Sequence, residues 1–142
     1  MFMRYLFSSL AITSVFLITI GSSSNTPAAP LRDPQMAPLL LTLVTTAKEL
    51  DLYNSRCRKD GAGRYSDNLN KTLVSRYRMT ILDVQDRYFP ERDYRAAQAQ
   101  LDQHFFNQLQ ALGGCAAAKQ QGFFEQLRER FDQALAELLR LL

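Results

Sequence analysis

Two cysteines, Cys57 and Cys115, are the residues of this chain whose chemistry depends most on their surroundings. An oxidising compartment favours a disulfide between two such residues, whereas the cytosol favours free or metal-bound thiols. Cys115 follows two glycines and could open a helix, where the helix dipole lowers the pKa of a thiol and makes it nucleophilic. The chain has no CxxC pair for thiol exchange and no CxxCH sequence for covalent haem. We therefore predict that Cys57 and Cys115 form a structural disulfide.

The single histidine, His104, lacks the companions that a metal site requires. A zinc-protease helix needs a second histidine four residues away, and those positions hold Gln100 and Gln108. Di-metal sites in helical bundles use Glu-x-x-His pairs, but the residue three positions before His104 is Leu101. On a helical wheel His104 lies at the flank of the apolar stripe, which predicts contact with both solvent and a neighbouring helix. We expect neither a metal site nor a cofactor.

Carboxylates gather between residues 83 and 93, where a pair of them could hydrolyse glycosides if an apolar pocket raised one pKa. They are Asp83, Asp86, Glu91 and Asp93, and they are interleaved with Arg87, Arg92 and Arg95. Mixed charges of this kind at helix ends are typical of a solvated, self-paired surface. The chain also has no GxSxG turn or comparable nucleophile sequence. We predict that it is not an enzyme and has no catalytic residues.

The segment of residues 56–78 is basic, with seven basic and two acidic residues. Arginine beside tyrosine, here Tyr65 and Tyr77, is a combination that binds phosphate or sulfate groups and stacks on rings. An exported protein would meet such groups in envelope polymers and anionic lipids, and no specific nucleic acid is expected as a partner. The residues predicted to bind an anion are Arg56, Arg58, Lys59, Arg64, Arg76 and Arg78. The alternative interpretation of this segment is a solvated helix end.

Three apolar residues do not fit the inward faces of the predicted helices. Phe106 lies about 120° from the centre of the apolar stripe of its helix. Leu139 and Leu141 cannot both face the same core as Leu138 and Leu142. Exposed apolar side chains that lie together mark association surfaces. We therefore predict an interaction surface at Phe106, Leu139 and Leu141, used for self-association or by a partner helix; the alternative is an extended core.

Residues 1–24 have the three parts of a secretory signal: a basic start at Arg4, an apolar run and a region of small residues for cleavage. The apolar run is about 15 residues long, which is below the roughly 20 that a helix needs to cross a bilayer. Cleavage could also fall as late as residue 28, and residues 25–34 are expected to form a disordered linker. We predict a periplasmic or extracellular protein with no stable membrane span after cleavage; a retained membrane anchor is the alternative.

From residue 33 onward, apolar residues recur at intervals of three and four, the spacing of amphipathic helices. No run alternates apolar and polar residues as a half-buried strand does. A further short helical turn is expected after Cys115. We predict long helices over residues 35–58, 66–88, 90–112 and 123–142.

Local signals mark the ends of these helices. Ser66 is a suitable N-cap for the second helix, which could break near Thr80 because Thr80 and Asp83 resemble a capping box. Proline fits the first position of a helix, so Pro90 is expected to open the third. The two glycines before Cys115 are expected to end it.

Four helices of about 20 to 24 residues, each roughly 30 to 36 Å long, suit an antiparallel four-helix bundle. Short connections imply up-down order, which places the ends of the first and third helices at the same pole. Cys57 and Cys115 fall at those two ends, so helix order and cysteine position agree on the disulfide. The predicted fold is all-α, an up-down four-helix bundle over residues 35–142 with one disulfide.

The leading functional prediction is an exported, non-enzymatic helical protein that acts through protein-protein interaction. The alternative is an anion-binding module for envelope polymer or anionic lipid, acting through residues 56–78. Net charge does not separate the two, because the chain without Arg4 carries 16 basic and 14 acidic residues.

Overall fold

The computed structural model describes residues 34–60 and 63–141, and over these residues the protein is helical. The long helices are α1 (Met36–Tyr53), α2 (Arg64–Tyr77), α4 (Tyr94–Ala111) and α6 (Phe123–Arg140). The shorter elements are the π-helical turn η2 (Asn54–Arg58) and the helices α3 (Ile81–Tyr88) and α5 (Cys115–Gln120). The prediction of an all-helical fold with one disulfide is therefore confirmed for the described residues.

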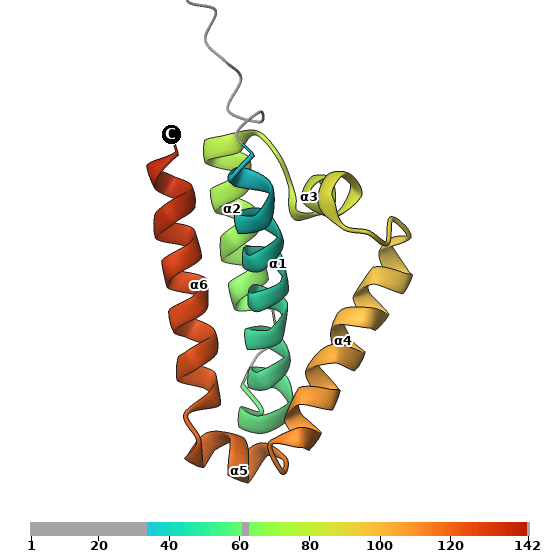
Figure 1. Cartoon of the computed structure of the whole chain (residues 1–142), viewed down its shortest axis with the longest axis vertical. Helices are drawn as coiled ribbons and strands as arrows, with labels where there is room; N and C mark the ends of the chain where they lie inside the picture. Colours follow the sequence, from blue (N-terminus) through green and yellow to red (C-terminus); the bar gives the residue numbers. More distant parts are fainter. Residues whose placement is uncertain (1–33, 61–62, 142) are drawn as a thin grey trace, which may run out of the picture.

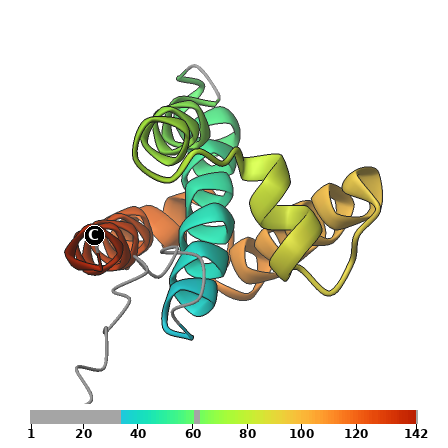
Figure 2. The same cartoon turned by 90° about the horizontal axis from the view of Figure 1, so that it is seen from above.

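Helix α1 is the centre of the fold and contacts α2, α3, α4 and α6, an arrangement that is seen from two directions in Figures 1 and 2. The consecutive residues Glu49, Leu50 and Asp51 are all buried. Because successive side chains on a helix point about 100° apart, burial of all three means that α1 is covered on most of its sides. Helix α1 is thus the core helix around which the others are placed.

Helices α2 and α6 each pack against α1, and long side chains join them to one another. The Tyr77 hydroxyl of α2 donates a hydrogen bond of 2.6 Å to the Leu138 carbonyl of α6. Nearer the other end, the rings of Tyr65 and Phe131 meet edge to face with centroids 5.7 Å apart. Helices α1, α2 and α6 therefore form a three-helix unit.

Helix α4 leans away from this unit, so the closed four-helix bundle predicted from the sequence is not confirmed. In Figure 1 its lower end lies near α1, and its upper end diverges toward α3. Only Ala97, Phe105 and Leu109 are buried on this 18-residue helix. A set of buried side chains this small covers one narrow stripe, so most of the surface of α4 faces away from the rest of the protein.

The helical path breaks between α2 and α3, and this break directs α4 away from the three-helix unit. Arg78 adopts a left-handed conformation with φ of 56° and ends α2. Thr80 then caps α3 with a capping box: its hydroxyl accepts from the Asp83 amide at 3.1 Å, and the Asp83 carboxylate accepts from the Thr80 amide at 2.6 Å. The break considered at Thr80 is therefore present, and α3 lies beside α1, between α1 and α4, when the molecule is seen from above (Figure 2).

The predicted start of the third long helix at Pro90 is wrong. Helix α4 begins at Tyr94, and Asp93 is its N-cap, with its carboxylate accepting from the Ala96 amide at 2.8 Å. Asp93 satisfies an amide that Pro90 could not, because capping requires a side-chain acceptor. Pro90 belongs to the connection between α3 and α4 instead.

The predicted start of the second helix near Ser66 is also displaced. Helix α2 begins at Arg64, and no side chain of its own N-cap residue caps it. The buried Asp51 carboxylate of α1 does so from outside, accepting from the amides of Tyr65 and Ser66 at 2.9 Å each. A carboxylate at a helix N-terminus also interacts favourably with the helix dipole, so Asp51 ties α2 to α1.

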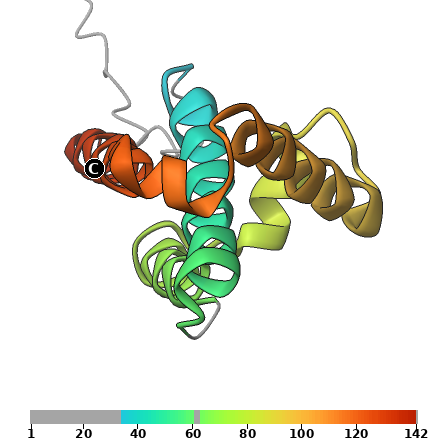
Figure 3. The same ribbon diagram turned by 90° about the horizontal axis from the view of Figure 1, so that it is seen from below.

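The predicted disulfide is confirmed. Cys57 in η2 and Cys115 at the start of α5 have sulfurs 2.00 Å apart and Cα atoms 5.3 Å apart. Figure 3 shows α5 passing across the lower end of α1, where it connects α4 to α6. The disulfide therefore fastens the end of the central helix to the connection between two outer helices. We call this end of the molecule the disulfide pole.

The predicted signal peptide, residues 1–24, and the predicted linker up to residue 33 lie outside the described residues. Within residues 34–60 and 63–141, no helix combines the length and apolar character needed to cross a bilayer.

Candidate functional site

A groove with a volume of about 810 Å³ opens between α1, α2, α3 and α4, where α4 diverges from the three-helix unit. We call it the apolar groove, after its apolar lining residues Val44, Leu52, Ile81, Leu82 and Tyr94. Leu82 is 57% exposed and Tyr94 is 51% exposed, which is unusual for apolar residues of this size when they lie together. The break before α3 creates the groove. It separates α3, which carries Leu82, from the line of α2 and places α3 against α4, which begins at Tyr94.

Three polar residues of the apolar groove, Asp51, Asn70 and Lys48, have partners within the protein. The Asp51 carboxylate is occupied by the amides at the start of α2. The Asn70 side-chain oxygen accepts from the Ile81 amide at 2.9 Å, which ties α2 to the start of α3. Lys48 of α1 forms an ion pair of 3.1 Å with Asp102 of α4. These three groups are engaged within the protein, whereas the apolar side chains of Leu82 and Tyr94 are exposed at the groove.

Asp51 and Asp67 are the acids that line the apolar groove. Of the acids that line the groove, Asp51 is committed to capping, and Asp67 lies in the first turn of α2. In the part of the chain that the structure describes, no group of three or more His, Cys, Asp and Glu residues could hold a metal ion. The geometry of the groove suits binding of an apolar surface.

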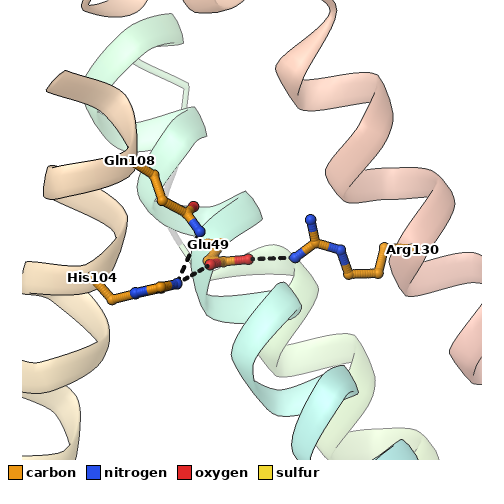
Figure 4. A network of polar contacts seen from close by, with 4 residues as sticks. All are labelled: Glu49, His104, Gln108 and Arg130. Atoms are coloured by element: carbon orange, nitrogen blue, oxygen red, sulfur yellow. Dashed lines mark hydrogen bonds and ion pairs between the residues drawn. The ribbon is translucent and has the colours of Figure 1, made fainter. Parts of the chain in front are cut away.

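A second notable site is the buried carboxylate of Glu49, which lies between α4 and α6 (Figure 4). Glu49 is 1% exposed. His104 Nε2 lies 3.8 Å from Glu49 Oε1, and Arg130 Nη1 lies 3.5 Å from Glu49 Oε2. Gln108 Nε2 lies 2.9 Å from the same nitrogen of His104. Both contacts to Glu49 are longer than good hydrogen bonds, so the carboxylate is only partly compensated for its burial.

Burial raises the pKa of Glu49 above its ordinary value of 4.5, and the nearby charges of Arg130 and His104 oppose that rise. A carboxyl group whose pKa is higher in the folded state binds its proton more tightly there. Its contribution to stability is therefore complete below pH 4.5 and is lost as the pH rises through the folded-state pKa. The charged form of Glu49 costs stability at neutral pH.

Glu49→Gln should remove this part of the pH dependence. Between pH 4.5 and pH 7 the variant is expected to lose less unfolding free energy than the native protein does. At pH 7 its stability should lie within about 1 kcal/mol of the native value, because half-exposed Arg130 and His104 can be solvated without the carboxylate. The measurement is urea unfolding across this pH range. Glu129→Gln, an exposed change on α6, should keep the native slope; equal slopes for native protein and Glu49→Gln would contradict the assignment.

The predicted anion-binding residues separate into two groups. Arg56, Arg58, Lys59 and Arg64 lie at the disulfide pole, whereas Arg76 and Arg78 lie at the far end of α2. Since α2 has 14 residues, the two groups are about 20 Å apart at 1.5 Å per residue. A single small anion could not contact both groups, so they are two separate candidate sites; the residues at the disulfide pole adjoin two hollows.

Two hollows flank Arg58 at that pole. One, with a volume of about 370 Å³, is the arginine cavity, lined by Asn54, Arg58, Asp60, Arg64, Tyr65, Asn68 and Phe124. The other, of about 530 Å³, adjoins the disulfide and is lined in part by Arg58, Lys119 and Glu125. Lys119 comes from α5 and was not among the residues predicted from the sequence. Lys119 is far in sequence from residues 56–78, so the sequence pattern did not connect it with them. The disulfide was the one sequence signal that α5 lies near Arg58.

The predicted interaction residues do not form one surface. Phe106 of α4 is 37% exposed, and the Arg56 guanidinium lies 5.7 Å from its ring centroid at the disulfide pole. Leu139, 39% exposed, and Leu141, which packs partly against the core, lie at the opposite end of α6. Leu82 and Tyr94, which are exposed and line the same groove, were missed because α3 was expected to continue the predicted helix over residues 66–88.

Comparison of the chain with models of protein families, with curated protein sequences and with solved structures finds no significant match.

Proposed function

We propose that this chain is an exported, non-enzymatic helical protein that binds another protein, and that an apolar segment of the partner lies in the apolar groove. The observation that carries the proposal is the pairing of Leu82 and Tyr94 at the groove. Among the described residues, the exposed large hydrophobic side chains are Val74, Leu82, Tyr94, Phe106 and Leu139. Of these, Leu82 and Tyr94 line the groove.

An amphipathic helix is the partner segment that best fits this shape. Such a helix binds in a groove through about three or four apolar anchors spaced by one turn of helix. A volume of about 810 Å³ is large enough for several side chains of this kind. Asp51, Asn70 and Lys48 at the groove are engaged within the protein, so an apolar partner face would leave fewer buried polar groups unsatisfied than a polar one.

Export is supported by the disulfide. Cysteine pairs persist in the periplasm and outside cells and are rare in the cytosol, where thiols are kept reduced. The Cys57–Cys115 pair is compatible with such a location, and the predicted signal at residues 1–24 is the feature that would direct the chain there.

A photo-reactive phenylalanine analogue placed at Leu82 is expected to cross-link one defined partner in the native compartment, because that residue lies at the groove. The same analogue at Val74 is the matched control, since Val74 is 44% exposed and does not line the groove. Mass spectrometry identifies the adduct. A second copy of this chain as the adduct would identify the partner as a self-association.

The purified pair then provides the quantitative test. Leu82→Asp should weaken binding by about ten-fold or more, as expected for a buried anchor, and Val74→Asp should change it by less than about two-fold. Both variants should keep the native unfolding midpoint, since both residues are exposed. Cross-linking of the same mixture from both positions, or equal losses in the two variants, would show that the groove is not the binding site.

A further inference from the structure

Arg58 is held in a position that leaves its donors open to solvent. Its guanidinium carbon lies 3.6 Å from the centroid of the Phe124 ring and 5.6 Å from that of Tyr53. A guanidinium that lies over an aromatic ring keeps its N–H groups at its edge, where they can bind an anion. The Glu125 carboxylate approaches Arg58 only to 4.0 Å, which is longer than a hydrogen bond.

Arg64 borders the same cavity from the start of α2. One of its nitrogens donates to Asp60 at 3.1 Å, and a guanidinium has five N–H donors, so others remain. The amides of Asn54 and Asn68 line the arginine cavity as well and can donate to an oxygen. The cavity therefore combines two guanidinium groups with neutral donors.

The charge and size of the arginine cavity define its ligand. Arg58 and Arg64 against Asp60 leave one net positive charge among the lining residues, which matches a phosphodiester with its single negative charge. Arginine is the residue best suited to bind two phosphate oxygens at once. A volume of about 370 Å³ is near the lower end of small-molecule sites, so a headgroup fits better than a folded polymer.

We infer that the arginine cavity binds a phosphodiester group, with Arg58 and Arg64 as its charged ligands and Lys119 as a cation for the adjoining part of the molecule. This site is separate from the apolar groove: the groove and the cavity share no lining residue, and a failure of either assignment leaves the other standing. The ligand could be a phospholipid headgroup or a soluble phosphodiester, because both present the same group.

The test uses the full-length oxidised chain and two probes. Soluble glycerophosphoglycerol is titrated by calorimetry, and vesicles of phosphatidylglycerol are compared with vesicles of phosphatidylcholine by flotation. The variants are Arg58→Gln with Arg64→Gln and, as the matched control, Arg76→Gln with Arg78→Gln. The two double variants have the same charge and the same N-terminal residues, so they differ only in the position of the lost arginines.

Loss of Arg58 and Arg64 is expected to weaken binding of the effective probe by about ten-fold or more. The control double variant should change it by less than about two-fold, and rising salt should weaken the remaining binding. Binding of the soluble probe would identify a free phosphodiester as sufficient, and binding of vesicles alone would identify the lipid headgroup. Equal losses in the two double variants, or saturable binding of neither probe, would overturn the inference.

Two single variants keep the test valid if the double variant is unstable. Arg58→Lys retains the charge and removes the planar pair of donors, so binding should fall by about three-fold or more. Asp60→Asn removes an exposed carboxylate and frees Arg64, so binding should become tighter by a similar factor. Unchanged affinity in Asp60→Asn, with the fold intact by circular dichroism, would count against the inference.

Discussion

Replacing both cysteines, with Cys57→Ser and Cys115→Ser, is expected to lower the free energy of unfolding by about 4 kcal/mol in the chain-entropy model of disulfides. The two residues are 58 positions apart in sequence, so the disulfide closes a long loop and restricts the unfolded chain strongly. A loss of this size is a large share of the roughly 5 to 15 kcal/mol that stabilises a typical domain.

The measurements are guanidinium unfolding and thermal unfolding of the oxidised protein, the reduced protein and the double serine variant. The last two should agree, and the melting temperature of each should fall by roughly 15 to 30 °C for a domain of this length. The single variants Cys57→Ser and Cys115→Ser serve as controls, because each should lose the same stability as the pair. A double variant as stable as the oxidised protein would show that the disulfide contributes nothing to stability.

The second large effect is expected for Phe105→Ala, with a loss of about 4 kcal/mol. Phe105 is fully buried, and its ring centroid lies 6.4 Å from that of Phe123 in α6. It is the largest of the three buried residues of α4, so it supplies most of the apolar contact that holds this helix. Truncation to alanine removes that contact and leaves a cavity at the centre of the packing.

Phe106→Ala is a closely matched control, since it deletes the same side chain one position along the same helix. Phe106 is 37% exposed, and its ring meets the guanidinium of the exposed residue Arg56, so the loss of the Phe106 side chain should cost less than about 1 kcal/mol. Both variants are compared by urea unfolding. Equal losses for the two would show that α4 is not anchored through Phe105.

Hydrogen exchange should show where Phe105→Ala acts. Because Phe105 anchors α4 to the core, amides of α4 are expected to lose more protection in Phe105→Ala than those of α2. The ion pair of Lys48 with Asp102 and the contact of His104 with Glu49 would remain as links between α4 and α1. Exposed or partly solvated pairs of this kind contribute little, so they would not replace the lost apolar contact.

Several features of the fold were predictable because they depend on local patterns. Apolar residues spaced by three and four identified the long helices, and Thr80 with Asp83 marked a position at which the helix over residues 66–88 could break, where the structure has the start of α3. The disulfide followed from two cysteines at helix ends that short connections bring together. In contrast, Pro90 and Asp93 were both suitable residues for the start of α4, and the propensity of each residue could not decide between them.

The candidate sites depended on contacts that no local pattern describes. Glu49 is polar and stands in a helix with a clear apolar face, so its burial required that α4 and α6 cover two further sides of α1. Residues 39–44 are apolar except for Thr42, and this was a signal that could have identified α1 as a central helix. Leu82, Tyr94 and Lys119 became candidate binding residues only through the placement of α3, α4 and α5.

The sequence by itself determined that the described chain is helical, where most helices end, and which two cysteines pair, because side-chain periodicity, capping and loop closure act along the chain. The tertiary structure decided that α4 leans away, that an apolar groove opens beside it, and that the basic residues split into two groups. These outcomes depend on which helix faces meet, and that choice is set by the total packing of residues far apart in sequence. The left-handed backbone at Arg78 is one example, since it redirects the chain toward α3 and α4.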